Sequence, residues 1–118
     1  MADDTDNGKK ADMREFSRID HQCMVSYREK GSQDYDVAQT RNVSVGGMYL
    51  KTPRAFESGV LLELLVRFPF FPQRVPVTGI VIGSRNDVPG FGTSIRFLDL
   101  NQGVARQLDA YISAHRQT

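Results

Sequence analysis

Hydrophobic positions follow a two-residue period over most of the chain and a helical period only near its end. Short apolar or alternating runs are separated by polar segments that contain Gly or Pro, which is the pattern of strands joined by turns. The six runs predicted to be strands cover residues 19–27, 35–43, 48–51, 61–68, 75–82 and 91–97. Short strands at such even spacing are typical of a β-barrel or a β-sandwich.

Alternation also predicts which side chains share one side of a strand. In the second run Tyr35, Val37, Gln39 and Val43 are candidates for a common side. In the last run Ile95 and Phe97 share one face. Residues 86–90 form a polar segment with Pro and Gly and are predicted to be a turn.

The final segment changes to the period of a helix. The apolar residues spaced at i, i+4, i+7 and i+8 are Val104, Leu108, Tyr111 and Ile112. Asp99 or Asn101 can cap the start of this helix, and His115 and Arg116 suit the negative end of its dipole. We therefore predict a mainly β fold, a small six-stranded barrel over about 19–98. One C-terminal helix over about 101–115 should lie against the barrel or cover one end.

Composition limits the partners. The chain has 118 residues, enough for one domain, and its 15 Lys and Arg against 14 Asp and Glu give a net charge of +1. Such balance argues against a protein that holds duplex nucleic acid through bulk charge. Residues 1–13 sum to −2 and have few apolar side chains, so we expect a flexible tail before a mildly basic domain over 14–118.

The sequence gives little support for catalysis, a metal or a membrane. Cys23 is the only cysteine, His21 and His115 are the only histidines, and none has the spacing of a zinc site. No catalytic triad or phosphate loop can be assembled, so we predict no enzyme activity, cofactor or metal. No apolar run spans a membrane and the start lacks a signal sequence, which predicts a cytoplasmic protein.

Two local patterns indicate a ligand. Arg14 and Arg18 stand four apart before the first strand, and each guanidinium can hold a phosphate or engage guanine. The run Asn-Val-Ser-Val-Gly-Gly places Asn42, Ser44 and Gly47 at a strand-end turn, with an amide, a hydroxyl and a residue without Cβ. Each pattern alone occurs by chance, since paired arginines are often solvated and Asn, Ser and Gly are common in turns. Together they describe a site for a flat, polar, anionic ligand.

These residues resemble the PilZ domains, small bacterial β-barrels whose binding members recognise cyclic di-GMP through RxxxR followed by [D/N]xSxxG. The resemblance covers about residues 13–113. It extends to the runs Val-Thr-Gly-Ile-Val at 77–81 and Gly-Thr-Ser-Ile-Arg-Phe at 92–97, and to the closing helix.

The resemblance implies a role for each matching residue. Arg14 and Arg18, in a hinge over 14–18, would grip phosphates and guanine. Asn42 and Ser44 would bond a guanine edge or a phosphate, and Gly47 would shape the turn. Further candidates for contact with the ligand are Arg41, Gly46, Tyr49 and Arg96.

Three positions depart from the family pattern. Asn42 replaces the commoner Asp, so it brings no negative charge to the guanine N–H groups. Ser94 stands where many members have a second Gly, and Met13 stands where many have another Arg, a position that bears on whether one nucleotide or a stacked pair is held.

The leading hypothesis is therefore a cyclic di-GMP receptor that signals to a protein partner by a change of conformation, as a monomer or a dimer. One alternative is a PilZ-like interaction module that binds no nucleotide and works through the apolar residues 68–72, which are otherwise core. Another is a barrel that binds single-stranded nucleic acid, for which the chain lacks a basic and aromatic stripe.

Overall fold

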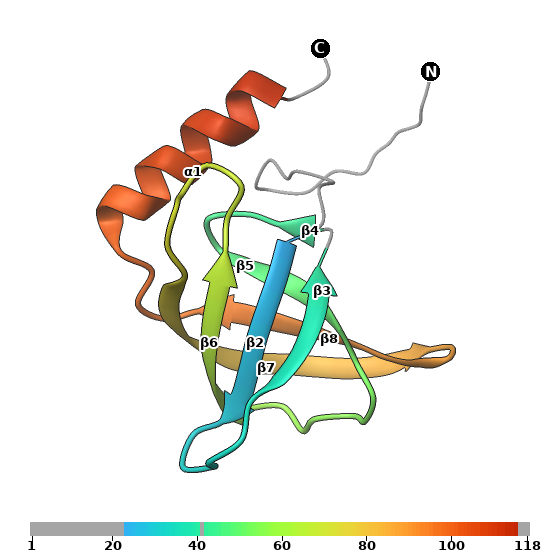
Figure 1. The fold of residues 1–118 in the computed structure, drawn as a ribbon. Helices are drawn as coiled ribbons and strands as arrows, with labels where there is room; N and C mark the ends of the chain where they lie inside the picture. The colour runs from blue at the N-terminus through green and yellow to red at the C-terminus, as the bar shows by residue number, and fades with distance from the viewer. Residues whose placement is uncertain (1–22, 41, 116–118) are drawn as a thin grey trace, which may run out of the picture.

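The computed structural model describes residues 23–40 and 42–115, which form seven strands and one helix (Figure 1). The elements in chain order are β2 (Cys23–Glu29), β3 (Asp36–Thr40), β4 (Asn42–Val43), β5 (Gly47–Thr52), β6 (Leu61–Arg67), β7 (Val75–Asp87), β8 (Gly90–Phe97) and α1 (Gln102–His115). The predicted tail, at 1–13, and the predicted hinge, at 14–18, lie outside the described residues. No helix within the described ranges is long and apolar enough to cross a membrane.

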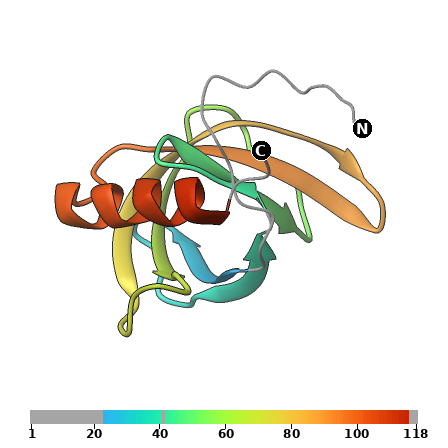
Figure 2. The same cartoon turned by 90° about the horizontal axis from the view of Figure 1, so that it is seen from above.

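The strands form one antiparallel sheet in the order β3-β2-β6-β7-β8-β5-β4. This sheet curls on itself, as the view in Figure 2 shows. Its two ends are β3 and β4, which only residue 41 separates along the chain, so the sheet is nearly closed into a barrel. The predicted barrel fold is confirmed. The strand count is seven instead of six because the predicted run 35–43 is divided into β3 and β4.

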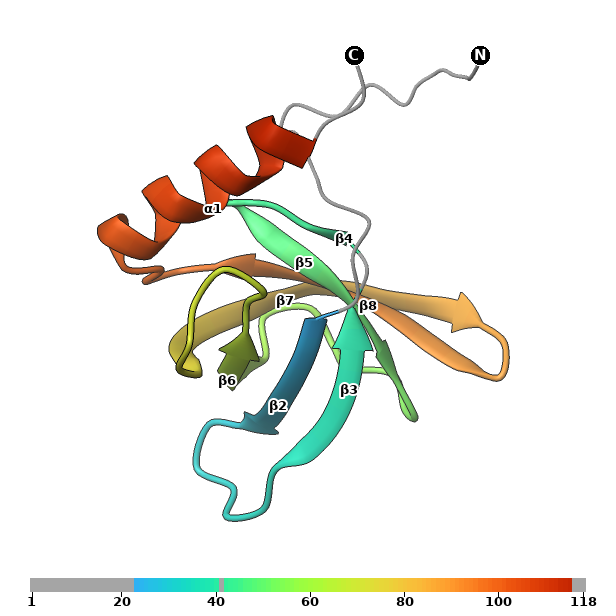
Figure 3. The same cartoon turned by 45° about the horizontal axis from the view of Figure 1, so that its top comes forward.

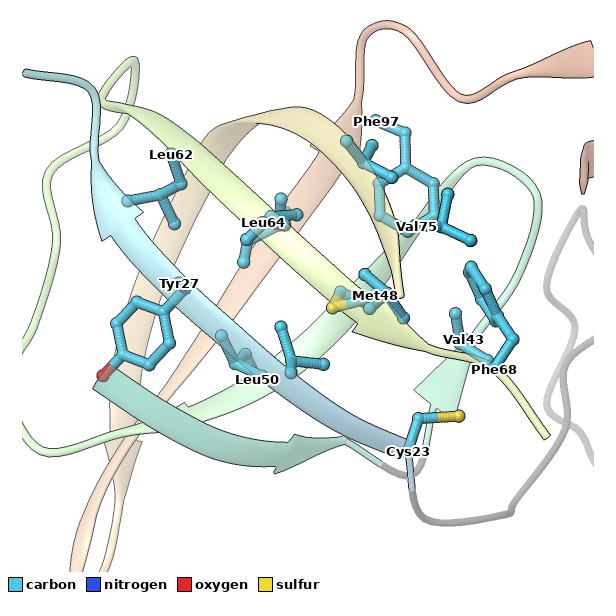
Figure 4. Close-up of a cluster of buried hydrophobic side chains, with 14 of the residues drawn as sticks. Cys23, Tyr27, Val43, Met48, Leu50, Leu62, Leu64, Phe68, Val75 and Phe97 are labelled. Atoms are coloured by element: carbon cyan, nitrogen blue, oxygen red, sulfur yellow. The ribbon is translucent and has the colours of Figure 1, made fainter. Parts of the chain in front are cut away.

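Alternating side chains of the strands fill the interior. Figure 4 shows residues of β2, β4, β5, β6, β7 and β8 meeting in one cluster, with Phe68 at its edge. The predicted pair Ile95 and Phe97 belongs to this core, with 3% and 9% of their surfaces exposed. Cys23 is buried there as well, and the loss of hydration raises the pKa of its thiol.

The side predicted for the second run is wrong in part. Val43 is buried, but Tyr35, Val37 and Gln39 are exposed, and it is Thr40 that points inward. Thr40 and Val43 are both buried although they stand three positions apart, which strict alternation does not allow. The alternation of buried and exposed side chains therefore shifts by one residue between β3 and β4.

The turn predicted at 86–90 is narrower than expected. Asn86 and Asp87 belong to β7 and Gly90 begins β8, so only Val88 and Pro89 form the turn. The longer strands make a hairpin that extends beyond the rest of the sheet, on the side away from α1 (Figures 1 and 3).

Helix α1 lies across one end of the barrel (Figure 3). Val104, Leu108 and Ile112 are buried on the predicted face, and Tyr111 packs against the core. Of the two predicted caps Asn101 is used: its Oδ1 accepts from the backbone N–H of Gly103 at 2.8 Å and of Val104 at 3.2 Å. Asp99 instead accepts from the N–H of Thr78 at 2.6 Å.

Aromatic residues of the segment 68–72 pack against this helix. Phe68 is buried, and its ring stacks on Phe70 with the centroids 5.1 Å apart. The Phe70 ring lies 5.5 Å from that of Tyr111. These contacts favour the core interpretation of the segment over an exposed interaction surface.

Candidate functional site

A tight turn between β4 and β5 presents the second motif. The N–H of Ser44 donates to the carbonyl of Gly47 at 2.9 Å, which closes the turn. The N–H of Gly46 donates to the Ser44 hydroxyl oxygen at 3.2 Å. Ser44 is 8% exposed, and its hydroxyl proton is not consumed by this bond. The turn thus fixes the position of a hydroxyl that can still donate.

Gly47 is required by a close approach of two strands. A Cβ at this position would lie 2.0 Å from the carbonyl oxygen of Ile95 and 3.1 Å from the Cα of Arg96. A positive φ is not the reason for this glycine, since the positive-φ glycines in the described chain are Gly31 and Gly59. Gly47 therefore acts through its missing side chain, which lets β5 lie directly against β8.

Outward side chains form a row across four strands. Asn42 on β4 pairs with Tyr49 on β5, and Tyr49 pairs with Ser94 on β8. Ser94 in turn lies opposite Gly83 on β7. Neither the Asn42 amide nor the Ser94 hydroxyl has a hydrogen-bond partner within 23–40 and 42–115. The row therefore offers polar groups that a ligand can engage.

A shallow depression of about 460 Å³ lies over one side of this row. Its lining includes Asn42, Ser44, Gly47, Ser94 and Arg96. The volume falls in the range of small-molecule sites, about 300–1,000 Å³. Arg96 is exposed and has no ion-pair partner in the described part of the chain. The depression thus combines hydroxyl and amide groups with one available positive charge.

Tyr49 is held in place by the hairpin. Its hydroxyl donates to Oδ2 of Asp87 at 2.7 Å, and its ring lies over Gly92, where a Cβ would come 2.1 Å from Cζ. The Lys51 ammonium contacts Asp87 Oδ1 at 3.4 Å and donates to the Asp87 carbonyl. The bond from Tyr49 and the charge of Lys51 hold the pKa of Asp87 below its ordinary value. Asp87 therefore stays ionised and fixes the ring.

A second depression, of about 400 Å³, lies on the hairpin side of Tyr49. It shares Asn42, Tyr49, Ile82 and Ser94 with the first, so the two depressions adjoin. It adds Arg85, whose guanidinium lies 5.5 Å from the centre of the Tyr49 ring. No local motif marks Ile82, Arg85 or Asp87, because their place in the site depends on the length of the hairpin.

A buried chain of hydroxyl groups supports these strands from below. The Thr52 hydroxyl donates to the carbonyl of Arg54 at 2.8 Å. The hydroxyl oxygens of Thr52 and Thr93 are 2.9 Å apart, and because the Thr52 proton is already used, Thr93 is the donor of this bond. Thr93 then accepts from Ser84 at 2.6 Å, and Ser84 accepts from the N–H of Phe56 at 2.9 Å. Every member is satisfied, and the chain joins β5, β8 and β7 beneath the site.

The structure places the predicted site residues unevenly. Those that it brings to one face are Asn42, Ser44, Gly46, Gly47, Tyr49 and Arg96. Arg14, Arg18 and Arg41 lie outside the described residues. No group of three His, Cys, Asp or Glu side chains that could hold a metal occurs in the described ranges.

The geometry is that of a small antiparallel barrel, capped at one end by a helix, with a shallow polar site on its outer wall. The PilZ domain family model matches residues 12–114, and the chain belongs to this family. Its members are binding and adaptor modules, and no enzyme family is indicated.

A solved structure shares the fold. It is the Inhibitor of motility (MotI/DgrA) of Bacillus subtilis, with a TM-score of 0.73 and 19% identity. The match covers 92% of this chain and 56% of that one, so the chain spans about half the length of this neighbour. No curated protein matches the sequence.

Proposed function

We propose that this PilZ domain is a receptor for cyclic di-GMP, which it binds between Arg14 and Arg18 and the outer face of the barrel. Binding would then signal to a protein partner. The observation that carries the proposal is that Asn42, Ser44 and Arg96 line one depression of suitable volume, in a chain that also has both family motifs.

The chemistry of this face suits a cyclic dinucleotide. Arg96 can neutralise a phosphate, and the Ser44 hydroxyl can donate to a phosphate oxygen. The Asn42 amide has a donor and an acceptor, so it can bond the edge of a guanine. Because position 42 is Asn and not Asp, the guanine N–H groups would donate to a neutral amide oxygen and not to a carboxylate.

The chain enters the fold beside the site. Cys23, the first described residue, pairs with Thr40, which stands two positions before Asn42. Arg18 precedes Cys23 by five residues, a span of up to roughly 17 Å of extended chain. We therefore propose that Arg18 reaches the depression, and that contact between the preceding segment and a ligand would link binding to a change of surface.

Motility is one process that such a receptor could serve, since the structural neighbour is named as an inhibitor of motility. The partner would read the difference between the free and the bound surface. Adhesion, biofilm formation and development are further processes of the same signalling class.

Isothermal titration at moderate salt tests the binding. We expect saturable heat for the wild type with cyclic di-GMP and affinities at least about 30-fold weaker for Arg14→Ala and Arg18→Ala. That factor corresponds to about 2 kcal/mol, the usual contribution of a charged hydrogen bond. Ser44→Ala should also weaken binding.

Arg106→Ala is the matched control, because Arg106 is exposed on α1 and lines neither depression. It should bind as the wild type does. Absence of heat and of affinity in the wild type would remove the proposal, and so would wild-type affinity in all three site variants.

A further inference from the structure

We infer that the depression on the hairpin side of Tyr49, here called the arm pocket, binds a purine base of the nucleotide. Its walls are Tyr49, Ile82 and Arg85, and its edges are Asn42 and Ser94. The inference rests on the proposed function and adds to it residues that neither family motif contains.

The arm pocket has an apolar wall where a strand would ordinarily be polar. The pairing of β7 with β8 shifts between Val81 and Gly83, and Ile82 occupies this bulge. Bulges re-aim side chains and are common beside binding sites. Ile82 is 52% exposed, so part of its aliphatic surface is in contact with water. A flat ring placed against it would recover that apolar surface.

Glycines keep the pocket open to a flat ligand. Gly83 has no neighbouring atom within 4 Å of where its Cβ would stand, so space is free directly above β7. Gly92 is covered by the Tyr49 ring instead. The open floor at Gly83 and the closed floor at Gly92 leave a slot whose one side is an aromatic ring.

Arg85 adds a planar cation beside the Tyr49 ring. Its guanidinium stands 5.5 Å from the ring centre, within the range of a cation–π contact, so a base would lie against the outer face of the guanidinium and not between the two groups. A guanidinium in this position can stack on a purine or donate to O6 and N7 of guanine. Tyr49 cannot swing away, because Asp87 holds its hydroxyl at 2.7 Å. The pocket is therefore formed before the ligand arrives.

The polar edges match the remaining atoms of a base. The Asn42 amide and the Ser94 hydroxyl have no hydrogen-bond partner in the described ranges, and both line the boundary with the depression that holds Ser44 and Arg96. A nucleotide can thus place its base in the arm pocket and its phosphate near Arg96, in the adjoining depression.

Methyl-labelled NMR tests the placement directly. The wild type, labelled at the δ1 methyl groups of isoleucine, is titrated with cyclic di-GMP. We expect the Ile82 methyl signal to move upfield through the ring current of the base and to show an intermolecular NOE to purine H8. Ile112 is buried on α1 and lines neither depression, so its signal should stay.

Affinity measurements complete the test. Ile82→Ser and Arg85→Ala should each weaken binding about tenfold or more, the size expected for covering an aliphatic side chain with the base and for a charged hydrogen bond from Arg85. Val88→Ser, at the exposed tip of the same hairpin, should leave it unchanged. Thermal unfolding checks that each variant is folded.

Two results would overturn the inference in distinguishable ways. In the first, the wild type binds cyclic di-GMP, Ile82→Ser and Arg85→Ala bind with unchanged affinity, and Ile82 shows no NOE to the ligand. This result keeps the proposed function but shows that the arm pocket does not hold the base. A wild type with no affinity for cyclic di-GMP removes both.

Discussion

Substitution of Gly47 by Ala should destabilise the barrel strongly, because the new methyl group meets backbone and not a side chain. The added Cβ would stand 2.0 Å from the carbonyl oxygen of Ile95. A relaxed carbon–oxygen contact needs about 3.3 Å, so β5 and β8 must separate locally by about 1.3 Å.

That displacement breaks a hydrogen bond between the two strands. The N–H of Phe97 on β8 donates to the Gly46 carbonyl at 2.9 Å. This bond does not survive a separation that brings the two atoms to about 4 Å apart. One lost bond at about 1 kcal/mol, with about 1–3 kcal/mol of overpacking, gives a loss of about 2–4 kcal/mol.

Urea unfolding followed by circular dichroism measures this loss. We expect the midpoint of Gly47→Ala to fall by roughly 1–2 M relative to the wild type at an unchanged slope. Gly83→Ala is the control: its Cβ would have no neighbour within 4 Å and its φ is not positive. It should equal the wild type or exceed it by up to about 1 kcal/mol. A Gly47→Ala variant within about 0.5 kcal/mol of the wild type would refute the reasoning.

The other predictions concern single interactions. Thr93→Val removes the centre of the hydroxyl chain, leaves the Ser84 proton without its acceptor and should cost about 1–3 kcal/mol in urea unfolding; an unchanged midpoint would contradict the chain. Asn101→Ala should cost about 1 kcal/mol by loss of the helix cap, whereas Gln102→Ala, one position later and exposed, should cost little. Cys23 should react with Ellman's reagent only after denaturation, because burial shields the thiol and raises its pKa; rapid reaction of the folded protein would be inconsistent with the core. The folded-state pKa of Asp87 is lowered, so its contribution to stability is present above its ordinary pKa and is lost as pH falls through the folded value. The wild type should therefore lose its greater stability over Asp87→Asn as the pH drops below about 4. A difference in stability that does not depend on pH would argue against a stabilising role of the ionised Asp87 carboxylate.

Local periodicity was sufficient to predict the barrel and its helix. The strands around Leu64 and Ile95 alternate because one face is buried along their whole length. The helix face at Leu108 follows from the same reasoning with a period of 3.6 residues. Gly31, which has a positive φ, lies between β2 and β3, where the pattern also has a break.

The phase of β3 and the length of the hairpin could not be predicted in this way. Val37 is apolar but 64% exposed, since the inward position at the end of β3 belongs to Thr40, whose hydroxyl bonds the backbone carbonyl of Tyr49. The polar residues Asn86 and Asp87 resemble a turn, yet they pair with β8. Their pairing depends on a partner strand, which the local pattern does not encode.

The motif residues of the candidate site were visible in the sequence, but their surroundings were not. Asn42 and Ser44 stand close together in the chain, so a local pattern reveals them. Tyr49 and Asp87 are 38 positions apart and meet only because the hairpin folds over β5. The arm pocket therefore depends on tertiary pairing that no local motif records.

The central claim is that the face built by the β4–β5 turn and β8 binds cyclic di-GMP, and amide chemical-shift mapping of the uniformly labelled wild type tests it most directly. The account predicts saturable shifts at Ser44, Gly47, Ser94 and Arg96, with unmoved signals at Ser26 and Leu65, which pair on the β2–β6 side of the barrel. Shifts confined to the β2–β6 side, or none at saturating nucleotide, would contradict it.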